Sequence, residues 1–180
     1  MQQPVTETLD KAVAGERLTA AEGLQLLQTD DLTALGRAAD AVTRRLHPEP
    51  YRTYNIDRNI NYTNVCNVYC KFCAFWRSEK AADAYVITHG EIDQKIEETL
   101  ALNGTQILMQ GGHHPKLTKQ WYLDLLSHIR EKFPSINVHG FSPSEFIHFR
   151  DVFDEPLEDI IRDFREAGLG SIPGGGGEIL

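Results

Sequence analysis

Apolar residues within the first fifty positions recur at the three- and four-residue spacing of amphipathic helices. Thr19 and Glu22 form a capping-box pattern, which predicts the start of a helix whose leucines follow at positions 24, 26 and 27. A second helix is predicted at Asp31–Leu46, and the HPEP segment at 47–50 ends it because proline cannot continue the hydrogen-bond ladder. We therefore expect a helical N-terminal extension at residues 1–50.

After residue 50, short β-branched or apolar runs alternate with helical patterns. Four strands are predicted, at Tyr54–Val65, Thr105–Gln110, Ile136–Phe141 and Leu169–Ile172. Three helices are predicted between them, from the Thr88–Glu91 capping box to Gly104, from Thr118 to Pro134, and at Pro156–Ala167. Strands that alternate with helices through short connections form parallel sheets.

This alternation predicts an α/β fold for residues 51–180, with each strand's carboxyl end followed by glycines, polar residues or cysteines. In a β/α barrel, that end of the strands carries the active site, and a complete barrel takes about 250 residues. The pattern supplies only about four strand–helix units, which is half of such a barrel. Since a half-barrel alone leaves two unpaired edges, we expect the chain to be a piece of a longer protein.

Composition and charge narrow the class of protein. Hydrophobic residues make up 41% of the chain, yet no apolar run approaches the ~18 residues of a membrane span. The N-terminus has no basic segment followed by an apolar one, so it is not a secretory signal. A net charge of -8 argues against a nucleic-acid partner. Three clustered cysteines do not make a disulfide framework, and free thiolates predict a reducing, cytoplasmic location.

The strongest chemical signal is the group Cys66, Cys70 and Cys73, which are the only cysteines in the chain. Structural zinc takes four protein ligands, and the usual iron–sulfur cluster takes four thiolates. Three thiolates in one loop therefore favour a 4Fe-4S cluster with one iron open to another ligand. Zinc completed by a distant histidine, or a non-catalytic iron–sulfur or zinc module, stays an alternative.

Other polar and small residues follow the predicted strands. Gly111 and Gly112 allow close approach of a ligand to the backbone, or simply form a turn. Glu145 could accept hydrogen bonds from ligand hydroxyl or amino groups, or complement a helix dipole. We interpret His139 as a core histidine without a catalytic role. Asn59 and Asn61 are expected to line the barrel interior, and the third asparagine of this segment, Asn64, to shape the cysteine loop by hydrogen bonding.

The cysteine spacing, with an aromatic residue directly before the third cysteine, resembles the signature of the radical S-adenosylmethionine (SAM) superfamily. The segments TYNIDRNINYTNVC, KFCAFWR, LMQGGHHP, FSPSE and SIPGGGGEIL resemble one subgroup of that superfamily. This subgroup comprises the futalosine-pathway enzymes of menaquinone biosynthesis and the deazaflavin-forming synthases. The resemblance runs from about residue 52 to residue 180 and implies a radical SAM β/α barrel, that is, a TIM-type barrel.

The resemblance implies two cofactors, a 4Fe-4S cluster held by the three cysteines and SAM bound to its open iron. It implies a set of cofactor-binding residues that comprises Phe72, Gln110, Gly111, Gly112, Ser142 and Glu145. It places the glycines at 174–177 against SAM or substrate. From their position just after the cysteine loop, Trp76 and Arg77 are expected to pack over the cluster. His113 departs from the superfamily, in which an acidic residue often follows the glycines. No catalytic side chain is identified.

The partners implied are a small, nucleoside-derived substrate and an external electron donor of the flavodoxin or ferredoxin type. Neither a nucleic acid nor a membrane is expected as a partner. The expected reaction is a cyclisation or synthase reaction that begins with a 5′-deoxyadenosyl radical.

Overall fold

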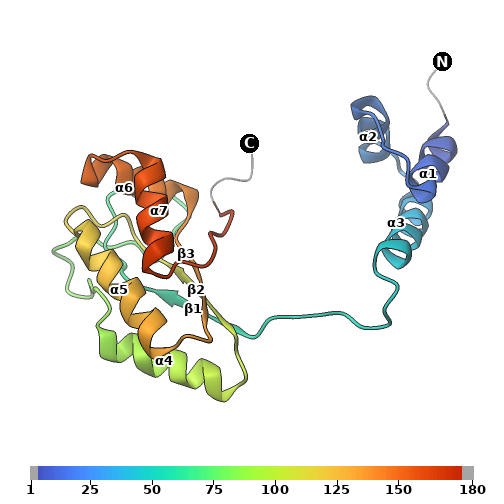
Figure 1. Ribbon diagram of the computed structural model, residues 1–180. Helices are drawn as coiled ribbons and strands as arrows, with labels where there is room; N and C mark the ends of the chain where they lie inside the picture. Colours follow the sequence, from blue (N-terminus) through green and yellow to red (C-terminus); the bar gives the residue numbers. More distant parts are fainter. Residues whose placement is uncertain (1–3, 176–180) are drawn as a thin grey trace. The chain divides into compact units, whose positions relative to one another are not determined.

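The computed structural model describes residues 4–175, and the chain divides into two compact units between Thr53 and Tyr54. The N-terminal unit contains three helices, α1 at Val5–Ala14, α2 at Ala20–Leu27 and α3 at Leu32–Leu46 (Figure 1). The predicted helical character of this segment is confirmed. No helix in the described range has the length and apolarity needed to cross a membrane.

The N-terminal unit is held by a capping box and an ion pair. The Thr19 hydroxyl accepts a hydrogen bond from the Glu22 N–H at 3.2 Å, and the Glu22 carboxylate accepts one from the Thr19 N–H at 2.7 Å. The same carboxylate accepts a hydrogen bond from Lys11 Nζ at 2.8 Å, which joins α1 to α2. The Lys11 ammonium is the main reason that the pKa of Glu22 is lowered to about 2.

The C-terminal unit contains a parallel sheet in the order β1-β2-β3. Its strands are β1 at Asp57–Asn61, β2 at Gln106–Gln110 and β3 at Asn137–Gly140. Its helices are α4 at His89–Ala101, α5 at Lys119–Lys132, α6 at Pro143–Phe153 and α7 at Leu157–Ala167. The predicted strand–helix alternation, the Thr88 capping box and the Thr118 cap are confirmed.

Alternate residues of the strands divide the sheet into an apolar and a polar face. Ile60, Ile107, Met109 and Val138 are buried on the apolar face, in one core with residues of α4 to α7. These four helices lie together on one side of the sheet (Figure 1). The opposite face of the strands is mainly polar and carries asparagines, glutamines, Asp57, His139 and the apolar Leu108, which are partly or fully exposed.

Two strand predictions were wrong in extent. The strand predicted at Tyr54–Val65 is confined to β1, because the chain after Asn61 turns toward another segment, where the Ile87 N–H donates to the Tyr62 carbonyl at 2.8 Å. The strand predicted at Leu169–Ile172 is reduced to a single parallel bridge between His139 and Ser171. The nearby proline at position 173 has no N–H with which to continue a ladder.

Helix α6 was not predicted, although its sequence carries helix signals. The Ser142 hydroxyl accepts a hydrogen bond from the Glu145 N–H at 3.2 Å, and proline occupies the first helical position. Phe146 and Phe149 are spaced for one helix face and are both buried. The SPSE segment therefore begins a helix that leads directly away from β3.

Candidate functional site

A buried carboxyl group joins the ends of two strands to the start of α6. Glu145 is 2% exposed, and its Oε1 atom accepts a hydrogen bond from the Tyr62 hydroxyl at 2.8 Å. The same oxygen accepts a hydrogen bond from the Gly111 N–H at 3.1 Å. Tyr62 directly follows β1, and Gly111 directly follows β2. The contact therefore fixes the strand ends that lead into the two most distinctive motifs of the sequence.

Aromatic packing surrounds this carboxyl contact. Tyr62 is fully buried, and its ring centroid lies 5.6 Å from that of Tyr122 and 5.7 Å from that of Phe141. Burial raises the pKa of the Tyr62 hydroxyl well above its ordinary value. Burial also raises the pKa of Glu145 to about 7, against the opposing effect of its hydrogen-bond donors. Glu145, a buried carboxyl group with a pKa near neutrality, thus holds the strand ends that border the site.

The glycine pair is required by the chain's own packing. A Cβ atom at Gly111 would lie 2.5 Å from the Tyr62 ring, and one at Gly112 would lie 2.1 Å from the Val65 carbonyl oxygen. The Gly112 N–H also donates to the Thr63 carbonyl at 2.9 Å. The sequence predicts that a ligand approaches these glycines, whereas the described contacts are with the chain's own segment, which leads into the first cysteine.

The cysteine loop is pinned at its base by backbone hydrogen bonds. The Cys66 N–H donates to the Arg77 carbonyl at 3.0 Å, and the Asn67 N–H donates to the His113 carbonyl at 3.2 Å. Cys66, Cys70 and Cys73 are partly buried and form no disulfide. Within residues 4–175, no three His, Cys, Asp or Glu side chains are grouped as ligands of one metal ion. The structure therefore brings the cysteines into one loop without gathering their sulfur atoms.

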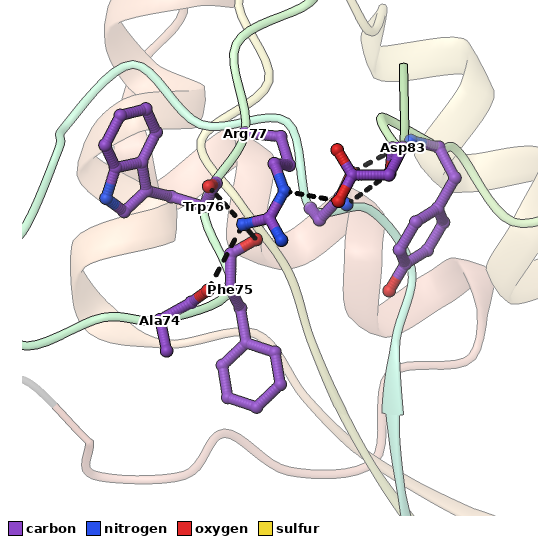
Figure 2. A network of polar contacts seen from close by, with 7 residues as sticks. Ala74, Phe75, Trp76, Arg77 and Asp83 are labelled. Carbon is purple, nitrogen blue, oxygen red and sulfur yellow. Dashed lines mark hydrogen bonds and ion pairs between the residues drawn. The ribbon is translucent and has the colours of Figure 1, made fainter. Parts of the chain in front are cut away.

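Arg77 closes the loop from its carboxyl side (Figure 2). Its Nε donates to Asp83 Oδ2 at 2.6 Å, and its guanidinium also donates to the backbone carbonyls of Ala74 and Trp76. The Arg77 guanidinium lowers the pKa of Asp83. Arg77 is thus engaged in holding the loop, and these contacts do not test the expectation that it covers a cluster.

Asn64 shapes the same loop, as predicted. Its Nδ2 donates to the Asp83 carbonyl at 2.8 Å, and its Oδ1 accepts from the Tyr85 N–H at 2.8 Å. Its backbone carbonyl accepts from the Arg77 N–H at 2.7 Å. Both ends of the loop therefore meet at one asparagine.

The remaining candidate residues lie at different depths. Phe72 is 92% exposed at the tip of the cysteine loop, whereas Ser142 is buried as the cap of α6. Gln110 ends β2 on its polar face, and a Cβ at Gly175 would lie 3.6 Å from Gln110 Nε2. Gly175 therefore lies beside the end of β2, and residues 176–177 of the glycine run lie outside the described residues.

Comparison with known proteins assigns the family. The sequence model of the radical SAM superfamily matches residues 60–175 of this chain, a range that includes the cysteine loop, the glycine pair and Glu145. The chain belongs to the radical SAM superfamily.

Two curated relatives match almost the whole chain. The chain is 46% identical, over 96% of its length, to cyclic dehypoxanthine futalosine synthase of Halalkalibacterium halodurans. It is 42% identical, over 99% of its length, to the Streptomyces coelicolor protein of the same name. It spans 46% and 45% of the lengths of these relatives.

The fold also matches that of a solved structure, HydG, a maturase of the [FeFe]-hydrogenase, with a TM-score of 0.60. The match covers 93% of this chain and 45% of that chain, at 17% identity. It supports the radical SAM fold alone.

The donor chemistry of the loop fits the cluster that the radical SAM family implies. Thiolates are the usual protein ligands of iron–sulfur clusters, and Cys66, Cys70 and Cys73 provide three of them within eight residues. The loop is held at its base by backbone contacts, and Phe72 at its tip is exposed. These three residues would hold the cluster.

His113 replaces the acidic residue that often follows the glycines in this superfamily. Its ring stacks on His148 at a centroid distance of 4.8 Å, and burial is the main reason that its pKa is lowered to about 4. The His148 Nε2 atom lies 3.1 Å from the His114 carbonyl oxygen. His148 and Tyr62 were missed by sequence reasoning, because both act through partners that are distant along the chain.

Gly112→Ala should destabilise the protein by about 1–3 kcal/mol, because the new methyl group would press on the Val65 backbone. Chemical denaturation of the intact protein measures this change. Gly90→Ala is the matched control, since a Cβ there would meet nothing within 4 Å and alanine favours the helix. Equal stability of the two variants would contradict the packing argument.

Glu145→Gln should alter how stability depends on pH. Since the pKa of Glu145 rises from 4.5 to about 7 on folding, its contribution to stability is complete below pH ~4.5 and is lost as pH rises to ~7. The glutamine variant should therefore gain up to ~3 kcal/mol relative to wild type between pH 5 and 8.

The difference between the two proteins is the quantity to measure by denaturation at each pH. The lowered pKa of His113 acts in the opposite sense, because the unfolded state binds that proton more readily, but His113 is present in both proteins. Parallel pH curves for wild type and Glu145→Gln would show that Glu145 does not titrate near neutrality.

Proposed function

We propose that this chain forms part of a radical SAM cyclase that converts dehypoxanthine futalosine to cyclic dehypoxanthine futalosine in menaquinone biosynthesis. The identity to two cyclic dehypoxanthine futalosine synthases over nearly the whole chain is the observation that carries this proposal. Aminofutalosine synthase and deazaflavin synthase, from the same subgroup, are the alternative activities.

Cys66, Cys70 and Cys73 would hold a 4Fe-4S cluster, and the segment from Gln110 to Gly112 would lie beside SAM. When bound, the cluster and SAM would supply a 5′-deoxyadenosyl radical, which would start ring closure of the substrate by hydrogen abstraction from its ribose. An external electron donor of the flavodoxin or ferredoxin type and a cytoplasmic location belong to this proposal.

The chain's own residues contribute position and polarity. The hydrogen bonds from Tyr62 and Gly111 to Glu145 fix where the cysteine loop and the glycine segment leave the sheet. The polar face of the sheet offers amide side chains at Asn59 and Gln110, which suit the hydroxyl groups of a ribose-bearing substrate. A substrate held on this face would lie on the side of the sheet opposite the helices.

The proposed activity is tested by product analysis of the intact, anaerobically reconstituted protein with SAM and a reductant. Dehypoxanthine futalosine should give the cyclic product together with 5′-deoxyadenosine. The substrates of aminofutalosine synthase and of the tyrosine-using deazaflavin synthase serve as matched comparisons. Turnover of either of these in place of dehypoxanthine futalosine would assign the protein to that neighbouring activity.

Replacing any one of Cys66, Cys70 or Cys73 by serine should prevent assembly of a stable cluster. Reconstituted wild-type protein should contain about four irons per chain, and each variant far fewer. Iron analysis and the visible absorption spectrum measure the loss without any need for turnover. Ser78→Ala, which lies just beyond the loop, is the control and should keep its iron. A cysteine variant with full iron content would remove that residue from the ligand set.

A further inference from the structure

Helix α6 holds the segment at 111–114, which follows β2, at two points one helical turn apart. Glu145 accepts a hydrogen bond from the first N–H of this segment at 3.1 Å. His148, three residues later on the same face of the helix, contacts the backbone of His114, and its ring stacks on that of His113. The helix thus holds the whole segment, and not only the end of the strand.

The contact of His148 with the backbone has a defined direction. A carbonyl oxygen only accepts hydrogen bonds, so His148 Nε2 donates its N–H to the His114 carbonyl at 3.1 Å. The His148 side chain is buried and stacked on His113, so it has little freedom to turn away from that carbonyl. Loss of this N–H would therefore remove the hydrogen bond that ties α6 to the end of the segment.

The same segment also contacts the first cysteine. The His113 carbonyl accepts a hydrogen bond from the Asn67 N–H at 3.2 Å, and Asn67 directly follows Cys66. A Cβ atom at Gly112 would lie 2.9 Å from the Cβ of Cys66. The segment therefore joins α6 to the cysteine loop, and a shift of its backbone would be passed to Cys66.

Other contacts of the segment are weaker supports. His114 Nδ1 accepts hydrogen bonds from the Lys116 and Leu117 N–H groups, at 3.1 and 3.2 Å, and these close a local turn. Lys116 Nζ lies 2.8 Å from Glu79 Oε1, beyond the cysteine loop, but both side chains are exposed. Exposed ion pairs contribute little to stability. The buried contact of His148 is therefore the firmer support of this turn.

We propose that His148 is a positioning residue for the iron–sulfur cluster, because its hydrogen bond to the His114 carbonyl fixes the backbone that holds Asn67 and thereby Cys66. The proposal rests on that part of the proposed function in which the three cysteines hold a cluster. His148 acts through the segment and is not itself a ligand. Loss of a hydrogen bond that orients a metal ligand commonly lowers metal affinity by about 10- to 100-fold.

His148→Met and His148→Gln form a matched pair that tests this role in the reconstituted protein. The two new side chains have nearly the same length and suit a helix, but only glutamine keeps an N–H donor. Neither reproduces the imidazole stack, so a difference between the variants reports the hydrogen bond. We expect His148→Met to lose iron to a chelator about tenfold faster than wild type, and His148→Gln to stay within about threefold.

The backbone amide of Asn67 provides a second measurement, which needs neither iron nor turnover. In the cluster-free protein, this N–H should exchange with solvent deuterium about fivefold faster in His148→Met than in His148→Gln, because its acceptor is held less firmly. His148→Ala is a second variant without a donor and should behave as His148→Met does.

His128→Met is the control for general destabilisation. His128 Nε2 lies 2.7 Å from Asp93 Oδ1, so this substitution breaks a contact between α5 and α4 rather than one with the segment. Chemical denaturation should show that His128→Met lowers stability, while its rate of iron loss should equal that of wild type.

The outcomes distinguish this role from the proposed function. Iron loss from His148→Met at the wild-type rate would overturn the role of His148, and so would equally fast loss from His148→Gln or from His128→Met. A wild-type protein that takes up no cluster would contradict the proposed function and, with it, this role. Faster iron loss and faster Asn67 exchange in the variants without a donor, with recovery in His148→Gln, would establish His148 as a positioning residue.

Discussion

The arrangement of the site depends on the two hydrogen bonds that meet at one carboxyl oxygen of Glu145. The Tyr62 hydroxyl comes from the end of β1, the Gly111 N–H from the end of β2, and Glu145 itself from the helix after β3. Because the carboxyl group is buried, leaving either donor unpaired would carry a desolvation penalty. Three consecutive strand–helix connections are therefore held in one geometry by a contact that lies within the core.

The position of the cysteine loop depends on these contacts of Glu145. Its entry at Val65 packs against Gly112, and its exit at Arg77 returns to pair with Cys66. Asn64 and Asp83 tie the two sides together. The base of the loop is thus well determined, while its aromatic tip around Phe72 is exposed. A rigid base and an accessible tip suit a loop whose sulfur atoms would converge on a cluster.

The sequence was informative where the signal is local. The capping boxes at Thr19 and Thr88 were correctly placed because a cap is decided within four residues. The burial of Glu145 was not foreseen, since its partner Tyr62 lies 83 residues away. The strand predicted at 169–172 was too long, because ladder formation depends on a neighbour and not on β-branched content alone. The contact between His139 and Ser171 was not foreseen either, because the two residues are 32 positions apart.

The two faces of the sheet have different roles. One face belongs to the core, and the other presents side chains that can be exchanged between related proteins. The apolar face carries the stability of the unit and the Glu145 contact fixes its geometry, whereas the polar face contributes amide and imidazole groups that the core does not need. Exchange of a side chain such as Asn59 or Gln110 would therefore leave folding largely intact. Substitutions on the polar face could therefore change which molecule binds there, while the buried contacts that position the cysteine loop stay the same.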